Sequence, residues 1–382
     1  MKNYSEKIRF LPLGFFLFFL VGTVGVQGDS ALMLELEEPQ EEENRESGSE
    51  ASPKAEFEIE VSNDRTITIT GYNGQGGDLV LPEEIDGKPV TAVGHRAFMA
   101  YGRGDESIRI TTVRIPEGVT SVGREAFRDN WHLTDVYIPA SLTDINRPAF
   151  SRCPRLMNFH IHEDNPAYRS IDGVFFTRDM DEIRHYPQGR EGDYVIPEGV
   201  TRIRDEAFRW AKDLTAISIP DSVTWIGKQA FRGCESLTEI ELPENLESLV
   251  RQGRHFMDCV SLERIVIPEA VTDIPQHTFS GCINLKEVIL PANLESIQQS
   301  AFQDCKSLEE ITIPAGVREL RGSRIFSGCE NLQKIIFLGD APEVSGSDHF
   351  PSKAIIYRRA GASGWPDAGQ SWNGQPTALL AE

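Results

Sequence analysis

The sequence predicts a solenoid of short parallel β rungs, each stacked on the next. One unit, L-x-x-I-x-I-P-x-x-V-T-x-I-G-x-x-A-F-x-x-C-x-x, recurs along much of the chain, so that Leu214 returns as Leu237, 23 residues later. A fixed period between roughly 20 and 50 residues is typical of architectures in which each unit buries its apolar face only against its neighbours.

Two single-residue registers let the rungs be followed along the chain. The proline register runs through Pro82, Pro116, Pro139, Pro197, Pro220, Pro243, Pro268, Pro291 and Pro314. The phenylalanine register runs through Phe98, Phe127, Phe150, Phe208, Phe231, Phe256, Phe279, Phe302 and Phe326. Most steps are 23 residues, which gives about eleven rungs, the last of them with its apolar tip at Phe337. The 35 residues from Ile161 to Ile196 exceed one period and indicate an inserted hairpin.

Each rung is expected to contain two short strands and one turn. In L-x-x-I-x-I the last apolar positions alternate as in a half-buried strand, and the following proline ends that strand because it has no N–H to donate. V-T-x-I is a second extended piece, and A-F-x-x-C is expected to form a single helical or 3₁₀ turn with its phenylalanine inward. If successive rungs stack about 4.8 Å apart, equivalent residues lie one above another, and the core consists of columns that each contain one residue type.

The two ends of the chain differ in composition from the repeats. Residues 1–28 resemble a secretory signal, with Lys2, Lys7 and Arg9 before an apolar run; an uncleaved membrane anchor is the alternative. Residues 29–56 are rich in Glu and are expected to form a disordered acidic linker.

The solenoid with its N-terminal cap is expected over residues 57–340. Residues 57–61 and 66–70 alternate as two strands, and this hairpin would cap the first rung. The hairpin insertion falls at about residues 163–190, and residues 341–382 form a C-terminal cap segment. Trp365 and Trp372 lie in this segment, where capping the last rung is one interpretation and stacking on a sugar is the other.

The charge limits the partners. The 382 residues carry a formal net charge of −21, which argues against nucleic acid and anionic lipid because both attract positive charge.

All six cysteines occupy one repeat position, the last of F-x-x-C. They are Cys153, Cys234, Cys259, Cys282, Cys305 and Cys329. Equivalent positions on stacked rungs have parallel Cα–Cβ bonds, whereas a disulfide needs these bonds to converge. A buried column of free thiols is therefore predicted in place of a disulfide framework.

The units IPEGVTSVGREAFRDNWHLTDVYIP and IPDSVTWIGKQAFRGCESLTEIELP resemble the leucine-rich repeats of bacterial BspA-like surface proteins. The insertion, with IDGVFF at residues 171–176, is similar to a hairpin that these proteins often carry, and the resemblance covers roughly residues 66–382. It implies a leucine-rich-repeat solenoid of the BspA-like type, secreted or exposed at the bacterial surface. It further implies a role in adhesion or protein binding, and it supplies no catalytic residue.

The residue between the two isoleucines of each strand should point away from the core. That column reads Arg114, Tyr137, His160, Val195, Ser218, Glu241, Val266, Ile289, Thr312 and Ile336. Its members vary, whereas core columns repeat one residue type; a ligand-facing surface varies in this way, and so does a neutral one. Val266, Ile289 and Ile336 are apolar and favour a protein-contact patch. The candidate ligand-face residues are Arg114, Tyr137, His160, Glu241, Val266, Ile289, Thr312 and Ile336.

The favoured function is an exported, non-enzymatic binding or adhesion module, monomeric and without cofactor or metal, that presents this face to a protein or a glycan at a cell surface. The alternative is a carbohydrate-active or metal-dependent enzyme that uses the inserted hairpin with His160 and His162, which lie two residues apart. A structural envelope protein without a specific ligand is a third possibility. The sequence contains no H-E-x-x-H, G-x-S-x-G or phosphate-loop motif that would favour catalysis.

Overall fold

The computed structural model describes residues 56–100, 109–250 and 253–380. The predicted signal segment and almost all of the acidic linker lie outside the described residues. The chain divides into residues 1–48 and 49–382, and every described element belongs to the second unit. Among the described residues, no helix is long and apolar enough to cross a membrane.

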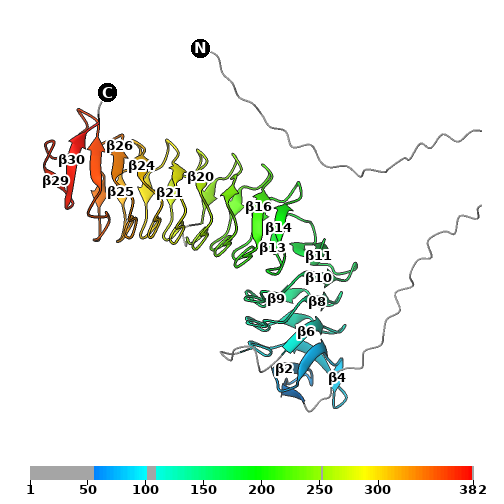
Figure 1. Ribbon diagram of the computed structural model, residues 1–382. Coiled ribbons are helices and arrows are strands. Elements are labelled where there is room, and N and C mark those ends of the chain that lie inside the picture. Colours follow the sequence, from blue (N-terminus) through cyan, green and yellow to red (C-terminus); the bar gives the residue numbers. More distant parts are fainter. Residues whose placement is uncertain (1–55, 101–108, 251–252, 381–382) are drawn as a thin grey trace, which may run out of the picture. The chain divides into compact units, whose positions relative to one another are not determined.

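The described elements are β-strands that stack in chain order (Figure 1). One strand of each rung belongs to what we call the long-strand face. These strands are β3 (Gly76–Val80), β6 (Arg109–Arg114), β8 (Asp135–Ile138), β10 (Asn158–Ile161), β14 (Gly192–Val195), β16 (Leu214–Ser218), β18 (Glu239–Ile240), β20 (Arg264–Val266), β22 (Glu287–Ile289), β24 (Glu310–Ile313), β26 (Lys334–Phe337), β28 (Ile355–Arg358) and β30 (Gln375–Leu379).

The second strand of each rung belongs to the short-strand face. These strands are β2 (Ile67–Tyr72), β5 (Lys88–Val93), β7 (Ser121–Val122), β9 (Asp144–Ile145), β13 (Glu182–His185), β15 (Arg202–Ile203), β17 (Trp225–Ile226), β19 (Ser248–Leu249), β21 (Asp273–Ile274), β23 (Ser296–Ile297), β25 (Glu319–Leu320) and β27 (Glu343–Val344). The remaining strands are β1 (Phe57–Val61), β4 (Glu84–Ile85), β11 (Tyr168–Ile171), β12 (Val174–Thr177) and β29 (Ser371–Trp372).

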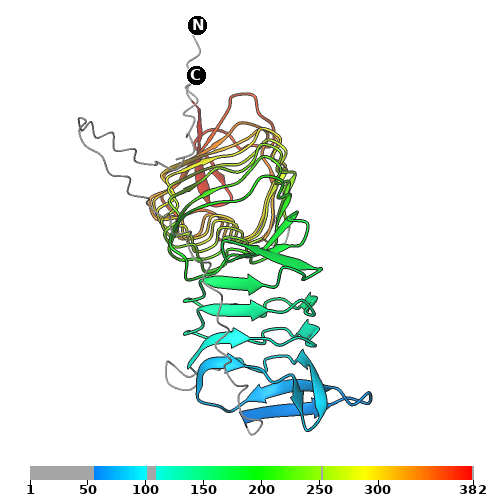
Figure 2. The ribbon, with the colours of Figure 1, turned by 90° about the vertical axis from the view of Figure 1, so that its right-hand side faces the viewer.

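Most neighbouring strands of each face pair in parallel, as the repeat predicts. Val266 pairs with Ile289, and Ile203 pairs with Ile226, so equivalent residues of successive rungs lie side by side. Seen along the stack, the successive loops of the later rungs nearly superimpose (Figure 2). The fold is a parallel β-solenoid, and the prediction of this class from the 23-residue period is confirmed.

The antiparallel pairs lie at the ends and in the insertion. β1 pairs antiparallel with β2, and β29 pairs antiparallel with β30. In the insertion β11, β12 and β13 form an antiparallel meander, and β13 then joins the parallel ladder beside β15. The segment expected to cap the C-terminus contains β28 and β30, which extend the long-strand ladder beyond β26.

The phenylalanine register forms a stacked column in the core. Phe127 lies 5.2 Å from Phe150 with the rings 5° from parallel, and Phe256 lies 5.6 Å from Phe279, also at 5°. The column is interrupted at the insertion, where Tyr186 stacks on Phe208 at 5.0 Å. Two clusters of buried side chains result, one before the insertion and one after it.

The turn that carries this phenylalanine is not helical, contrary to the expectation. Cys282 N donates to Phe279 O at 3.1 Å, which closes a tight turn. A left-handed residue lies two positions before and another lies two positions after most of these phenylalanines, as at His277 (φ 55°) and Gly281 (φ 79°) around Phe279. A helix needs negative φ throughout, so these positions break it, and the amides donate to the next rung instead.

The cysteines join successive rungs. All six are buried and free, and Cys282 Sγ donates to Phe256 O of the preceding rung at 3.0 Å. The same contact recurs from Cys153 to Phe127 O at 3.3 Å and from Cys305 to Phe279 O at 3.2 Å. Asn130 occupies the same position and donates to Phe98 O at 2.8 Å. In these rungs the position therefore holds a small side chain that donates to a carbonyl of the preceding rung.

We expect these thiols to react slowly in the native protein. Burial raises the pKa of Cys153 to about 12 and raises the pKa values of Cys234, Cys282 and Cys305 well above the usual one, so little thiolate is present at neutral pH. Labelling with a maleimide should be slow in buffer and should reach all six cysteines in denaturant. An inter-rung disulfide found by mass spectrometry after non-reducing digestion would contradict the parallel column.

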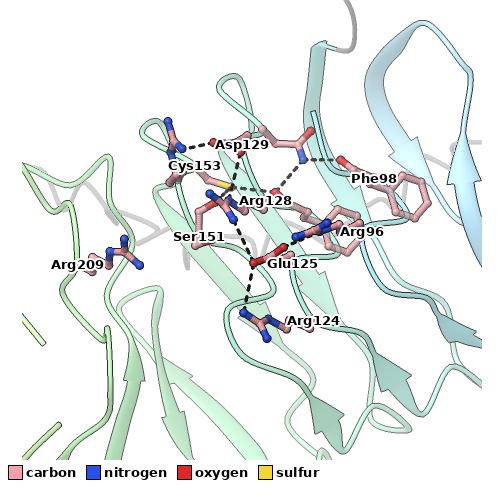
Figure 3. A network of polar contacts seen from close by, with 12 residues as sticks. Arg96, Phe98, Arg124, Glu125, Arg128, Asp129, Ser151, Cys153 and Arg209 are labelled. Carbon is pink, nitrogen blue, oxygen red and sulfur yellow. Dashed lines mark hydrogen bonds and ion pairs between the residues drawn. The ribbon is translucent and has the colours of Figure 1, made fainter. Parts of the chain in front are cut away.

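Glu125 lies in one of these turns and is 4% exposed, surrounded by arginines (Figure 3). Its carboxylate is 2.6 Å from Arg96 Nε and 3.1 Å from Arg128 Nη1, and 3.7 Å separates it from Arg124. Burial alone would raise the pKa of Glu125, but the hydrogen bond from Arg96 and the three positive charges outweigh it and lower the pKa. The ionised carboxylate thus ties two rungs together.

Replacing this carboxylate should make the stability less dependent on pH. Because the pKa of Glu125 is lowered by folding, its stabilising effect is present above the unfolded pKa, roughly 4.3, and is lost as the pH falls through the folded value. Glu125→Gln should cost about 1–3 kcal/mol at pH 7 and less at pH 3, measured by urea unfolding. Glu330→Gln, in an exposed pair with Lys306, is the control and should cost little at either pH. An equal loss from Glu125→Gln at both pH values would contradict this role.

Candidate functional site

The candidate ligand face is built by the ladder of the long-strand face. Arg114 pairs with Tyr137, Tyr137 pairs with His160, and Thr312 pairs with Ile336, so the outward residues of paired strands form continuous rows. The insertion divides the predicted column after His160, because β10 and β14 belong to separate sheets. Val195, with 69% of its surface exposed, and Ser218 begin the second part, and Glu241 follows β18 as an exposed residue.

The first part of the column is a stack of polar and aromatic groups. The Arg114 guanidinium lies 3.7 Å from the centre of the Tyr137 ring, and the His160 ring stacks on Tyr137 at 4.4 Å and 12°. His160 Nε2 is 2.8 Å from Asp135 Oδ1, which fixes the imidazole in place. Arg114 and His160 come from the rungs on either side of Tyr137, so they cover both faces of its ring.

The second part of the column is apolar. Val266 and Ile289 are paired neighbours, each with 40% of its surface exposed; we call these two residues the apolar strip. Ion pairs between successive rungs flank it, with Arg264 Nε 2.7 Å from Glu287 and Lys286 Nζ 2.9 Å from Glu263. Apolar residues inside a polar rim are the usual anatomy of a protein interface.

A hollow of about 770 Å³ lies beside the strip, between β22 and β24. These two strands belong to separate sheets, so the long-strand ladder opens at this point. Ile289, Leu290, Thr312 and Leu338 contribute to its lining together with charged side chains. The charged ones are Glu269, Lys286, Glu287, Glu309, Glu310 and Arg359, four acidic and two basic. The hollow can therefore take an apolar group, and its rim favours a positively charged neighbour.

Ile336 corrects one expectation. It was expected to be an exposed anchor, but it is only 7% exposed. The last rung was expected to end at Phe337, whereas β28 adds another strand, and Tyr357 pairs beside Ile336. The side chain is therefore covered from the rungs on both sides.

His160 and His162 do not come together on one metal site. His160 contacts Tyr137 and Asp135, whereas His162 Nδ1 accepts a hydrogen bond from its own turn, from Asp164 N at 3.2 Å. In the described part of the chain, no group of three or more His, Cys, Asp or Glu side chains is arranged to hold a metal ion.

The two C-terminal tryptophans pack on the solenoid. Trp365 lies 5.1 Å from Phe337 and 4.7 Å from Trp372, which in turn lies 5.7 Å from Phe337. Trp365 Nε1 donates to Gly339 O at 3.1 Å. Both indole rings therefore lie against Phe337 and against each other.

A sequence model for the BspA type leucine rich repeat region matches the chain in six copies, over residues 88–183, 193–253 and 250–350. These segments make up more than half of the 382 residues. The chain belongs to the BspA-type leucine-rich repeat family. No curated protein matches it.

Several solved structures are similar to this BspA-type protein. A leucine rich cell surface protein from Faecalibacterium prausnitzii is 22% identical, with 76% of this chain and 95% of that one covered and a TM-score of 0.40. A leucine-rich repeat protein from Eubacterium ventriosum is 18% identical, with 72% of this chain and 93% of that one covered and a TM-score of 0.47. The pneumococcal vaccine antigen PcpA is 14% identical, with 85% of this chain and 97% of that one covered and also a TM-score of 0.47.

Sequence reasoning missed two parts of this BspA-type surface, the hollow and Tyr357. The alternating run Ile355–Arg358 was a usable signal for β28, but it falls off the 23-residue period, since its partner strand starts 21 residues earlier at Lys334. The hollow has no such signal, because the units on both sides of it follow the repeat.

Proposed function

We propose that the protein is an exported, non-enzymatic binding module of the bacterial cell surface that holds a protein ligand on its long-strand face. The observation that carries this proposal is the apolar strip of Val266 and Ile289, half exposed beside a hollow of about 770 Å³ and flanked by ion pairs. Solenoids use such extended faces for recognition, and binding energy concentrates in a few apolar anchors that lose water on contact. The signal-like residues 1–28 support export, and the BspA-type repeat supports a binding role.

The charges of the hollow indicate the chemistry of the ligand. Four glutamates against one lysine and one arginine make its rim acidic, in a chain whose net charge is −21. A partner segment with an apolar side chain between basic residues would match this surface and would be attracted from a distance. We therefore expect the association rate to fall as the salt concentration rises.

A protein ligand is favoured over a glycan. Sugar recognition commonly uses an exposed aromatic ring, but both faces of the Tyr137 ring are covered, by Arg114 and by His160. Trp365 and Trp372 pack on Phe337 and on each other. The strip itself is aliphatic, which suits burial against a protein side chain.

Capture from cell-surface extracts tests this function. The full chain, immobilised, should retain one or a few proteins from extracts of host or neighbouring bacterial cells, and an excess of the free protein should displace them. Heat-denatured protein, immobilised at the same density, is the control. Retention that free protein does not displace, or that denatured protein reproduces, would contradict the proposal.

A further inference from the structure

A second cavity, of about 250 Å³, lies at the insertion, away from the long-strand face. It forms between β9 and β15, where the sheet that ends at β9 stops and the meander of β11, β12 and β13 takes over the short-strand face. Residues from both sides of this break line it, including Arg124 and Ser151 before the insertion and Arg204 and Arg209 after it. An ion pair of 2.8 Å between Arg147 and Asp205 bridges the break.

The lining of this cavity is strongly basic. Six of its side chains carry positive charge: Arg124, Arg147, Arg184, Arg204, Arg209 and Lys228. Only two, Asp205 and Glu206, carry negative charge. Even when Glu125 and Glu182, which pair with some of these arginines from outside the lining, are counted, positive charge remains in excess. In a chain of net charge −21, such a concentration of cations is unexpected for a merely solvated surface.

Several buried polar atoms in this lining have no hydrogen-bond partner. The Nε atom of Arg184 and the Nε2 atom of His185 are a buried donor and a potential donor without an acceptor. Arg209 Nε also lacks a hydrogen-bond partner, as does Arg232 Nε at the same repeat position outside the cavity. Gln188 is 3% exposed; its amide nitrogen donates to Arg209 O at 2.8 Å, while its Oε1 has no donor. Buried polar groups are rarely left unpaired, because the loss of their hydrogen bonds to water is then not compensated, so a cluster of them indicates a missing partner.

His185 does not add to the positive charge. The residue is half-buried when all its atoms are counted, but its Nε2 atom is buried. Burial lowers the pKa of the imidazole to about 4. The imidazole is therefore neutral at pH 7, and its ring lies edge-on to Phe159 at 5.3 Å.

We propose that this cavity binds a phosphate group, either as free phosphate or as part of a small phosphoester. Arginine forks match phosphate oxygens and give short, charge-assisted hydrogen bonds. A hydrogen phosphate or a phosphoester with a hydroxyl also brings an O–H that can donate to Gln188 Oε1, which sulfate lacks. The volume suits one small anion and its immediate substituent. Figure 3 shows Arg209 pointing from its own rung toward the rungs that carry Arg124 and Ser151.

The repeat supplies a matched pair of variants for the test. Arg209 and Arg232 each directly follow the phenylalanine of their rung, and each donates from Nη1 to a side chain three residues earlier, Glu206 or Gln229. Only Arg209 lines the cavity. Gln303 occupies the same repeat position, so a glutamine there is compatible with the fold.

Calorimetric titration of the full chain at constant ionic strength tests the site. Inorganic phosphate or glucose 6-phosphate should bind wild type saturably at one site, and Arg209→Gln should weaken that binding about tenfold or more, as expected for one lost charged hydrogen bond. Arg232→Gln should leave it within about twofold of wild type.

The two phosphate probes distinguish the sources. Tighter binding of glucose 6-phosphate identifies a phosphoester ligand, and tighter binding of inorganic phosphate identifies the free ion; both support the site. Sulfate binding as tight as phosphate would overturn the assignment to phosphate. The absence of saturable binding by either phosphate probe, or an equal loss in Arg209→Gln and Arg232→Gln, would overturn the site itself.

Discussion

Phe279→Ala should lower the free energy of unfolding by about 3–5 kcal/mol, the usual cost of removing a buried aromatic side chain. Phe279 is 0% exposed and lies between Phe256 at 5.6 Å and Phe302 at 5.4 Å. The cavity cannot readily collapse, because Phe279 N donates to Ala301 O and Phe256 N donates to Thr278 O, and these hydrogen bonds between turns fix the spacing of the rungs. Urea unfolding of wild type and variant measures the loss.

Ile283→Ala is the control for this experiment. Ile283 lies in the same rung with 39% of its surface exposed, so its truncation should cost less than about 1 kcal/mol. A loss below about 1 kcal/mol for Phe279→Ala would show that the phenylalanine column does not support the core.

Ile289→Asp should abolish capture of the surface ligand while the melting temperature stays within a few degrees of wild type. The side chain is on the outward face of β22 with 40% of its surface exposed, so a carboxylate there remains solvated and folding tolerates it. In the complex the same carboxylate would be buried without a partner beside Glu287 and Glu310, which line the same hollow, and burying an unpaired charge is costly. Titration of the captured ligand onto both proteins measures the change.

Ile283→Asp is the matched control for Ile289→Asp, because the two isoleucines lie six residues apart in the chain and expose nearly equal fractions, 39% and 40%. Ile283 follows the turn at Cys282 and lies outside the long-strand face, so its change should leave binding intact. If Ile283→Asp lost binding while Ile289→Asp retained binding, the ligand would bind on the turn side and not on the long-strand face.

The repeated part of the fold could be predicted from the sequence because each rung packs only on its neighbours. A residue such as Phe279 or Cys282 contacts the equivalent residues of the neighbouring rungs. The period alone therefore predicts that the residue is buried and that it belongs to a column of equivalent residues. The prediction of a helical turn was wrong. The spacing of residues in A-F-x-x-C does not reveal the two left-handed residues, such as His277 and Gly281, that direct backbone amides to the next rung.

Where the repeat is broken, the sequence indicates less. The insertion was visible as an excess of residues, but the cavity beside it depends on side chains from β9, from β13 and from the turn after β15, which are far apart in the chain. Ile336 was misplaced because its cover comes from Tyr357, beyond the last regular rung. The outward column was predicted from the alternation of apolar and polar residues along each strand. The hollow beside Ile289 lies where β22 and β24 do not pair with each other, and that alternation does not reveal an unpaired step.

Photo-crosslinking from single positions tests the central claim, ligand binding by the long-strand face, most directly. A benzoylphenylalanine introduced at position 289 or, in a second protein, at position 283 would be exposed to surface extract, irradiated and analysed by mass spectrometry. Position 289 should yield one dominant protein adduct that excess wild-type protein suppresses, and position 283 should yield none above background. An adduct from position 283 alone, or the same adduct in equal yield from both positions, would contradict the assignment of the ligand to this face.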